Sequence, residues 1–357
     1  MGLRKAKRGN MKFGLFDHIE NSGRDLATTF DERIRFIQAA DDAGFYAVHL
    51  AEHHCSPLNM VPVPGVFMGA LARVTKNIRF GPLVYLLPLY SPLRLAEEIC
   101  MLDHLSNGRL EVGVGRGVSP FELGFHKIDH DKSRDIFFDA YACLREALTH
   151  DVFSYEGPSY SYKNVPMALR PLQQPTPAFW YGSSNAVGST WAGEQGLHFV
   201  SNGPTTRAKA NIDTFREALA KRGAPAQPKA EFPGGVAIGV TRQIVVADTD
   251  EQARNIARGP AERHYKNLNW LRDNHASAEF ANRLVVPVAS TFEDNLREGS
   301  VIAGSPRTVA AEIEKQVAAL GINYLISYLF FGDMSFADAS RSLQLFRTEV
   351  MPKIAHL

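Results

Sequence analysis

The chain has 357 residues, of which 45% are hydrophobic and 22% charged, proportions that exclude a disordered or fibrous protein. The 39 basic and 38 acidic residues leave a net charge of +1, too little to favour binding to nucleic acid or to an anionic membrane. The small net charge therefore favours a small-molecule ligand. No apolar run reaches the roughly 18 residues that a membrane helix needs, and we expect a cytoplasmic protein.

A short basic segment, residues 1–10, opens the chain and lacks the apolar stretch of a signal peptide. We expect a disordered leader there, followed by a single domain over residues 11–357. The cysteines Cys55, Cys100 and Cys143 are too few and too scattered for a disulfide framework or a Cys-rich zinc site. We therefore predict no metal in the protein.

The first half of the chain alternates short apolar runs with amphipathic helical stretches, as repeated strand–helix units around a parallel sheet do. The predicted strands are Lys12–Phe16, Ala47–Ala51, Ile78–Leu87 and Leu110–Gly115. The predicted helices are Asp31–Gly44, Gly65–Val74, Pro92–Leu105 and Ser133–His150. Asp31 is expected to cap the first helix, and Gly44 is expected to end it.

The second half continues the same alternation after an irregular segment rich in Tyr and Pro, residues 153–177. The predicted strands are Ala178–Tyr181, Leu197–Ser201, Ile238–Ala247 and Tyr324–Phe330. One predicted helix begins at Ser183 or Ser184, and another begins at Asp248 or Thr249. Three further predicted helices cover Thr205–Lys221, Ser305–Leu320 and Ala337–Met351. Residues from about 259 to 304 have weak periodicity, which we interpret as an insertion.

Eight strand–helix units predict an α/β fold of the (β/α)8 TIM-barrel type, with insertions. Such barrels need about 250 residues, so roughly 100 remain for loops and insertions on one scaffold. The active site of a parallel barrel lies at the carboxyl ends of its strands. Polar clusters directly follow four of the predicted strands, at Asp17–His18, Glu52–His54, Gly113–Val118 and Gly182–Asn185.

The last two of these clusters have the residue types of a phosphate site. Ser183, Ser184 and Asn185 stand where a helix begins and can add side-chain donors to its free backbone N–H groups. Arg116 lies between two glycines and would add a forked cation for the same dianion. The alternative is that Ser184 only caps the helix and Arg116 is a surface residue.

The histidines after the second strand are adjacent and so point to opposite sides of an extended backbone. One of His53 and His54 can therefore face the pocket while the other is structural, and they cannot readily share a metal ion. The glycine cluster does not match a dinucleotide-binding fingerprint, because Val118 occupies the position of its third glycine.

Several motifs, taken together and in this order, resemble the bacterial luciferase-like monooxygenases. They are the runs Leu50–His54, Gly113–Gly117 and Tyr181–Asn185 with Trp191-Ala192, and the tail segments Ser305-Pro-Arg307 and Val350-Met-Pro352. The resemblance extends from about Met11 to the carboxyl terminus.

The resemblance implies an FMN over the barrel mouth, its phosphate held by Arg116, Ser184 and Asn185. It places His53 beside the reacting edge of the flavin. His54 is the second candidate catalytic residue, and Glu52 is a candidate cofactor-binding residue, as are Leu83, Val84 and Ser183. It also implies a homodimer, a separate flavin reductase that supplies reduced FMN, and dioxygen that oxygenates an aldehyde or ketone.

The same resemblance places the end of the third strand under the flavin, where relatives carry a cis peptide bond without proline. Leu83-Val84 is the candidate bond. Gly115 stands where the light-emitting subunit has a reactive cysteine, and Ser184 where it has an acidic residue. We therefore expect monooxygenation without useful light emission.

Three alternatives remain at this point. A deazaflavin F420-dependent oxidoreductase shares the barrel, although the Glu52–His54 run favours FMN. A non-catalytic flavin-binding protein is also compatible with the motifs. A metal-dependent barrel hydrolase would need His-x-His on the first strand, where this chain has Asp17-His18. The sequence does not identify the substrate, because the pocket would be shaped by loops such as Ser119–Lys132 and by the stretch 259–304.

Overall fold

A computed structural model describes residues 11–275 and 291–357, so the expected leader, residues 1–10, lies outside the described residues. All eight predicted strands form. They are β1 (Lys12–Asp17), β2 (Ala47–Leu50), β3 (Arg79–Pro82) with β4 (Tyr85–Leu86), β5 (Val112–Gly115), β8 (Phe179–Ser183), β9 (His198–Ser201), β10 (Ile238–Val246) and β12 (Tyr324–Tyr328). Their order is β3-β2-β1-β12-β10-β9-β8-β5-β4, with parallel pairing throughout.

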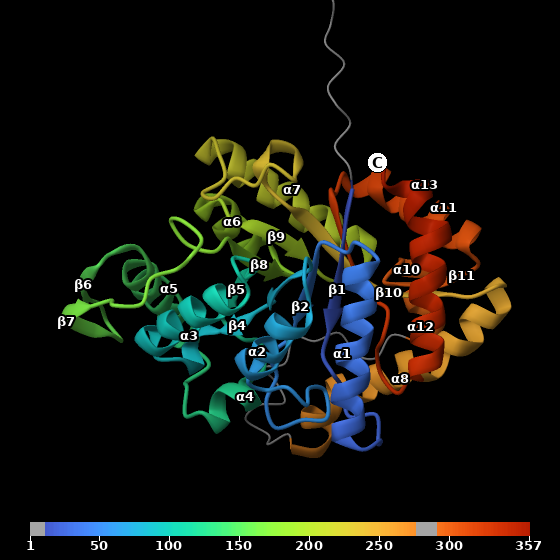
Figure 1. Ribbon diagram of the computed structural model, residues 1–357, viewed down its shortest axis with the longest axis horizontal. Helices are drawn as coiled ribbons and strands as arrows, with labels where there is room; N and C mark the ends of the chain where they lie inside the picture. Colours follow the sequence, from blue (N-terminus) through green and yellow to red (C-terminus); the bar gives the residue numbers. More distant parts are fainter. Residues whose placement is uncertain (1–10, 276–290) are drawn as a thin grey trace, which may run out of the picture.

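The sheet curls into a barrel because β3 and β4 are consecutive pieces of one chain segment between β2 and β5. Helices surround the strands (Figure 1). The longer ones are α1 (Leu26–Asp42), α2 (Pro64–Val74), α3 (Pro92–Leu105), α5 (Ser133–Thr149), α6 (Ala186–Gln195), α7 (Thr205–Arg222), α8 (Asp250–His275), α11 (Pro306–Leu320) and α12 (Phe336–Leu345). The predicted TIM barrel is confirmed.

The predicted third strand is interrupted. Its two halves, β3 and β4, meet at the cis peptide bond Leu83-Val84, so the candidate bond is confirmed. Inside the barrel, a cluster of buried side chains that includes Trp180 and Tyr324 fills the space between the strands. The core is therefore packed, and it leaves room for a ligand at the ends of the strands.

Two predicted helix starts are wrong. Helix α1 begins after Asp25, whose side chain accepts a hydrogen bond from the Thr28 N–H at 2.8 Å, whereas Asp31 lies inside the helix. Helix α6 begins after Asn185, whose Oδ1 accepts from the Gly188 N–H at 3.0 Å. In both places several residues in a row could cap a helix, and the direction of the incoming chain selects one.

The segment 153–177, predicted to be irregular, contains an antiparallel hairpin of β6 (Val152–Glu156) and β7 (Ser161–Pro166). Most of its side chains are at least partly exposed, with Phe153 buried. A hairpin that buries so little has no clear alternation of apolar and polar residues, which explains why the pattern did not predict it.

The predicted helix Ala337–Met351 is divided in the structure. It consists of α12, a π-helical turn Phe346–Val350 and α13 (Met351–Ile354).

The stretch predicted to be an insertion, 259–304, begins within α8 and ends with α10 (Phe292–Glu298) and β11 (Val301–Gly304), which pairs with the end of β10. Helix α8 has weak apolar periodicity because it buries polar residues, among them His264 and Asn267.

Within residues 11–275 and 291–357, no helix is both long enough and apolar enough to span a membrane.

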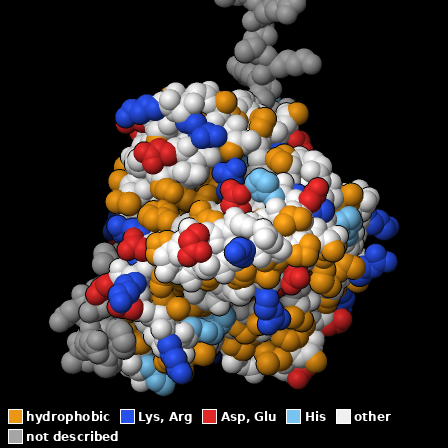
Figure 2. All heavy atoms as spheres, turned by 90° about the vertical axis from the view of Figure 1, so that its left-hand side faces the viewer, with side chains coloured by type: hydrophobic (Ala, Val, Ile, Leu, Met, Phe, Trp, Pro, Cys, Tyr) orange, Lys and Arg blue, Asp and Glu red, His pale blue; other side chains and the backbone are white. Residues whose placement is uncertain are grey.

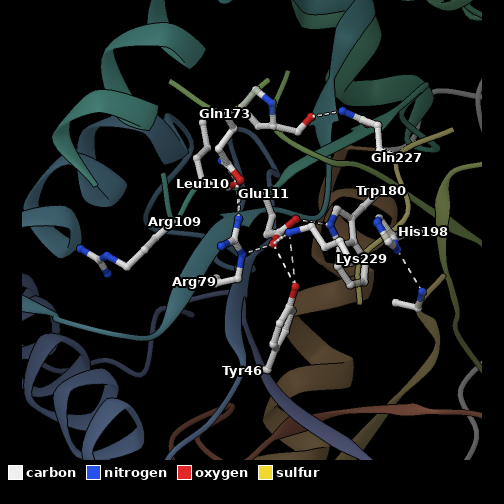
Figure 3. A network of polar contacts seen from close by, with 12 residues as sticks. Tyr46, Arg79, Arg109, Leu110, Glu111, Gln173, Trp180, His198, Gln227 and Lys229 are labelled. Atoms are coloured by element: carbon white, nitrogen blue, oxygen red, sulfur yellow. Dashed lines mark hydrogen bonds and ion pairs between the residues drawn. The ribbon is translucent and has the colours of Figure 1, made fainter. Parts of the chain in front are cut away.

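A buried polar network closes the amino-terminal end of the barrel (Figure 3). The Glu111 carboxylate, just before β5, forms ion pairs with Arg79 and with Lys229, which comes from the loop between α7 and β10. The same carboxylate accepts hydrogen bonds from Tyr46 Oη at 3.2 Å and from Trp180 Nε1 at 2.7 Å. Residues from four segments thus meet at one fully buried carboxylate.

Candidate active site

A cavity of about 210 Å³ lies at the carboxyl ends of the strands, at the opposite end of the barrel from Glu111. Most of the side chains predicted for the site line it. They are Glu52, His53, Leu83, Val84, Arg116, Ser183, Ser184 and Asn185. His54 does not line the cavity, so of the two adjacent histidines His53 is the one that faces it. A larger apolar groove lies on the surface between α2 and α3, and none of these predicted residues lines it.

His53 is held by a buried carboxylate. Its Nδ1 donates a hydrogen bond to Glu122 Oε1 at 3.0 Å, and the Glu122 side chain is only 3% exposed. Burial by itself lowers the pKa of His53, but the Glu122 charge and this hydrogen bond outweigh it, so the pKa is raised. Because Nδ1 is occupied, Nε2 is the nitrogen left to exchange a proton.

Glu122 was not among the predicted site residues, because Ser119–Lys132 was predicted to be a loop. A short helix, α4 (Pro120–Phe125), carries this residue, and its N-cap Ser119 accepts from the Glu122 N–H at 3.3 Å. Serine followed by proline and then by an acidic residue at the third helical position is a helix-start signal. That signal could have predicted the helix, but not the carboxylate's partner.

His54 and Glu52 form a second pair, directed away from His53. His54 Nε2 donates to Glu52 Oε1 at 2.9 Å, and the other Glu52 oxygen accepts from Leu86 N at 3.2 Å and from Tyr90 Oη at 2.9 Å. Burial raises the pKa of Glu52 despite these donors. The pair ties the end of β2 to the segment that contains β4.

Donors suited to a phosphate group line the opposite wall of the cavity. The half-buried Arg116 donates to Ser133 Oγ at 3.0 Å from one terminal nitrogen, and its other terminal nitrogen has no partner among the described residues. Ser184 and Asn185 are exposed at the start of α6, whereas the Ser183 hydroxyl is hydrogen-bonded to the Asn185 backbone. A guanidinium and a helix start beside one cavity fit the phosphate of FMN.

Gly115 explains one departure from the light-emitting relatives. A Cβ at this position would lie 2.3 Å from Val84 Cγ2, so a side chain here would clash with the Val84 side chain. The space below the cavity is therefore taken by Val84.

In the described parts of the chain, no group of three or more His, Cys, Asp or Glu residues is placed to hold a metal ion.

The comparisons with known proteins agree with the barrel and its cavity. The family model of the luciferase-like monooxygenases matches residues 11–324. The chain belongs to this family. It is 35% identical, over 99% of its length and 100% of the other chain, to an uncharacterized protein of Sinorhizobium fredii. It is 26% identical, over 96% of its length and 95% of the other chain, to the oxygenase component of a flavin-dependent trigonelline monooxygenase of Acinetobacter baylyi.

Solved structures share the fold of this luciferase-like chain. One is the oxygenating constituent of 3,6-diketocamphane monooxygenase from Pseudomonas putida in complex with FMN, with a TM-score of 0.78 and 24% identity over 97% of this chain and 99% of that one. Another is an F420-dependent secondary alcohol dehydrogenase, with a TM-score of 0.72 and 18% identity over 97% of this chain and 99% of that one. The barrel is thus shared by proteins that use different flavins.

Proposed function

We propose that the protein is the oxygenase component of a two-component monooxygenase, which receives reduced FMN from a separate flavin reductase. It would use dioxygen to transfer one oxygen atom to a small organic substrate such as an aldehyde or ketone. The observation that carries this proposal is the cavity, which brings the His53–Glu122 pair and the Arg116 phosphate donors to one barrel mouth. The trigonelline and diketocamphane relatives support the reaction class.

Each residue has a role in this proposal. Arg116, Ser184 and Asn185 would hold the FMN phosphate, and the segment Leu83-Val84 would lie against the ring system. When bound, reduced FMN supplies the electrons that activate dioxygen. His53 would hold or deliver a proton from Nε2, since Glu122 keeps its imidazole oriented and favours the protonated form.

Turnover with an added reductase tests the proposal. The protein would be mixed with FMN, NADH, a generic flavin reductase and a panel of aldehydes, ketones and sulfonates under ¹⁸O₂. We expect one ¹⁸O atom in the product, and no NADH oxidation by the protein without the reductase. If hydrogen peroxide is the sole product with every substrate, the protein is a flavin-binding protein without turnover.

F420 is the second candidate cofactor, because an F420-dependent dehydrogenase shares the barrel. We propose FMN on the grounds of the Glu52–His54 run and of the phosphate donors. Titration of the protein with reduced FMN and with reduced F420, followed by flavin fluorescence, compares the two directly. Tighter binding of F420 would overturn the choice of FMN.

We also propose a homodimer. Apolar side chains are exposed along a groove between α2 and α3, among them Val66 (76% exposed) and Met101 (56% exposed). Figure 2 views the side of the molecule that carries α3 and α5, where hydrophobic side chains lie between charged ones. Apolar patches of this kind favour association. Sedimentation of the wild type and of Val66→Lys should give a dimer and a monomer, respectively.

A further inference from the structure

A third histidine, His18, lines the cavity and has no role in the function proposed above. It follows β1 and is 8% exposed. Its Nδ1 is buried and has no hydrogen-bond partner in the described part of the chain. Since polar groups inside proteins are nearly always paired, an imidazole that lines a cavity and hydrogen-bonds no described residue is a candidate to bind what enters that cavity.

His18 is the middle member of a column of three imidazoles. Its ring centroid lies 5.5 Å from that of His53 and 5.3 Å from that of His264 on α8. Each outer histidine hydrogen-bonds a carboxylate, His53 with Glu122 at 3.0 Å and His264 with Glu20 at 2.9 Å. No carboxylate contacts His18 among the interactions of the described residues.

The column keeps its middle member uncharged. Burial, and then the neighbouring His264 and His53, hold the pKa of His18 well below its ordinary value. A neutral imidazole carries one N–H donor and one acceptor. His18 therefore offers a hydrogen bond to the cavity without offering a charge.

Aromatic rings flank this imidazole. The His18 ring lies 5.2 Å from Phe16 and is stacked on Tyr328 with centroids 5.6 Å apart, and both of these residues also line the cavity. This side of the cavity is thus a largely apolar, aromatic wall with one uncharged imidazole. Such a wall fits a compact apolar body that carries a single hydrogen-bonding atom.

The charges of the cavity point to the same kind of ligand. Arg116 is the only Lys or Arg among the described residues that line it, and the proposed function assigns that cation to the FMN phosphate. The two lining glutamates, Glu52 and Glu122, are each hydrogen-bonded to a histidine. Besides His53, whose charge the Glu122 carboxylate already offsets, no described lining residue on the His18 side can supply a cation to a substrate carboxylate, so burial of that anion would be costly.

We propose that His18 is a substrate-binding residue, which hydrogen-bonds the carbonyl oxygen of an uncharged substrate packed against Phe16 and Tyr328. This inference rests on the proposed function and deepens it. It names the substrate class as neutral carbonyl compounds, to the exclusion of carboxylates, and it names the group that selects them.

The test measures binding of three probes of similar shape to the FMN-loaded protein, by flavin fluorescence. The probes are benzaldehyde, toluene, which lacks the oxygen, and benzoate, which is charged. In the wild type we expect benzaldehyde to bind about tenfold more tightly than either of the others, since one hydrogen bond contributes about that factor. His18→Phe keeps a ring in the stack, so it should weaken benzaldehyde about tenfold and leave toluene unchanged.

Two further variants protect the test against misfolding. His18→Gln retains a donor and an acceptor, so it should recover part of the preference for benzaldehyde over toluene. His150→Phe makes the same change at an exposed position after α5 and should behave as the wild type. FMN affinity and thermal melting of each variant report on folding.

Several outcomes would overturn the inference. They are absence of benzaldehyde binding to the wild type, equal binding of benzoate, or an unchanged preference in a folded His18→Phe or, if that variant does not fold, in His18→Leu. A failed proposed function looks different, because the wild type would then form no product in the reductase assay with any substrate. Product formation together with an unchanged preference in these variants would refute the role of His18 alone.

Discussion

The two ends of the barrel treat buried ionisable groups in opposite ways. At the amino-terminal end, Glu111 is buried, but Lys229 and Arg79 outweigh the effect of burial and lower its pKa to about 2. At the carboxyl end, burial raises the pKa of Asp17 to about 6, although Arg33 Nε lies 3.5 Å from its carboxylate. The charge of Glu111 is thus fully stabilised, whereas that of Asp17 is not.

The hydrogen bonds follow the same division. Both Glu111 oxygens have donors, whereas His18 Nδ1 at the other end has no partner within the residues that the structure describes. A saturated network contributes to stability and has nothing left to offer a ligand. An unpaired group that lines a cavity, as His18 does, costs stability but is available for binding, and the ligand sites of TIM barrels lie at this end.

The largest effect should come from His53→Asn at the carboxyl end. Asparagine can still donate a hydrogen bond but does not titrate near neutral pH, so product formation should fall about 10²–10⁴-fold with little change in FMN binding. The measurement is hydrogen peroxide released per NADH consumed in the reductase assay. A stable variant with unchanged coupling of NADH use to product would remove His53 from the mechanism.

Glu111→Gln should have the largest effect on stability. The substitution leaves the partly buried Lys229 and Arg79 without their partner, and breaking a buried ion pair in this way costs about 3–5 kcal/mol. The free energy of unfolding in urea measures this loss, and FMN affinity of the folded variant should not change. Glu122→Gln is the matched control at the other end and should lose much less stability.

Acid unfolding adds an independent check on the same comparison. Since the pKa of Glu111 is about 2 in the folded protein and 4.5 ordinarily, its ion pairs stabilise the fold fully above pH 4.5. That contribution should be lost as the pH falls from 4.5 toward 2. If Glu111→Gln and the wild type show equal pH dependence of unfolding over this range, the network does not stabilise the fold in this way.

Arg116→Ala should weaken FMN about tenfold or more, because charge-assisted hydrogen bonds to a phosphate contribute about 1.5–3 kcal/mol. Riboflavin lacks the phosphate, so its affinity should change little. Titration of both flavins, followed by fluorescence, separates the phosphate contact from a general loss of the site. Equal losses for FMN and riboflavin would show that Arg116 acts elsewhere.

The smallest effect is a shift in pH dependence. Because Glu122 raises the pKa of His53, the charged pair is fully formed below pH 6.5 and is lost as the pH rises through the elevated pKa. Glu122→Gln removes the carboxylate, so the pH at which His53 loses its proton should fall. The pH profile of product formation measures this, and an unshifted profile would contradict the pairing.

The eight strands and the barrel could be predicted from the sequence because their signals are local. Apolar runs, turn residues and helix ends are read within a few positions, and polar residues after a strand of a parallel barrel must reach the same end. Glu52–His54 and Arg116 were placed at the cavity on that basis. Helix starts such as Asp25 and Asn185 were missed, because several neighbouring residues could cap equally well.

The partners of these residues were decided by the tertiary structure. Which of His53 and His54 faces the cavity depends on the bond to Glu122, 69 residues away in the sequence. The column around His18 depends on the contact of Glu20 with His264, 244 residues apart. Glu111 meets Lys229 across 118 residues. Sequence patterns report the periodicity of one segment, whereas burial, pKa and hydrogen bonding depend on which distant segments the closed barrel brings together.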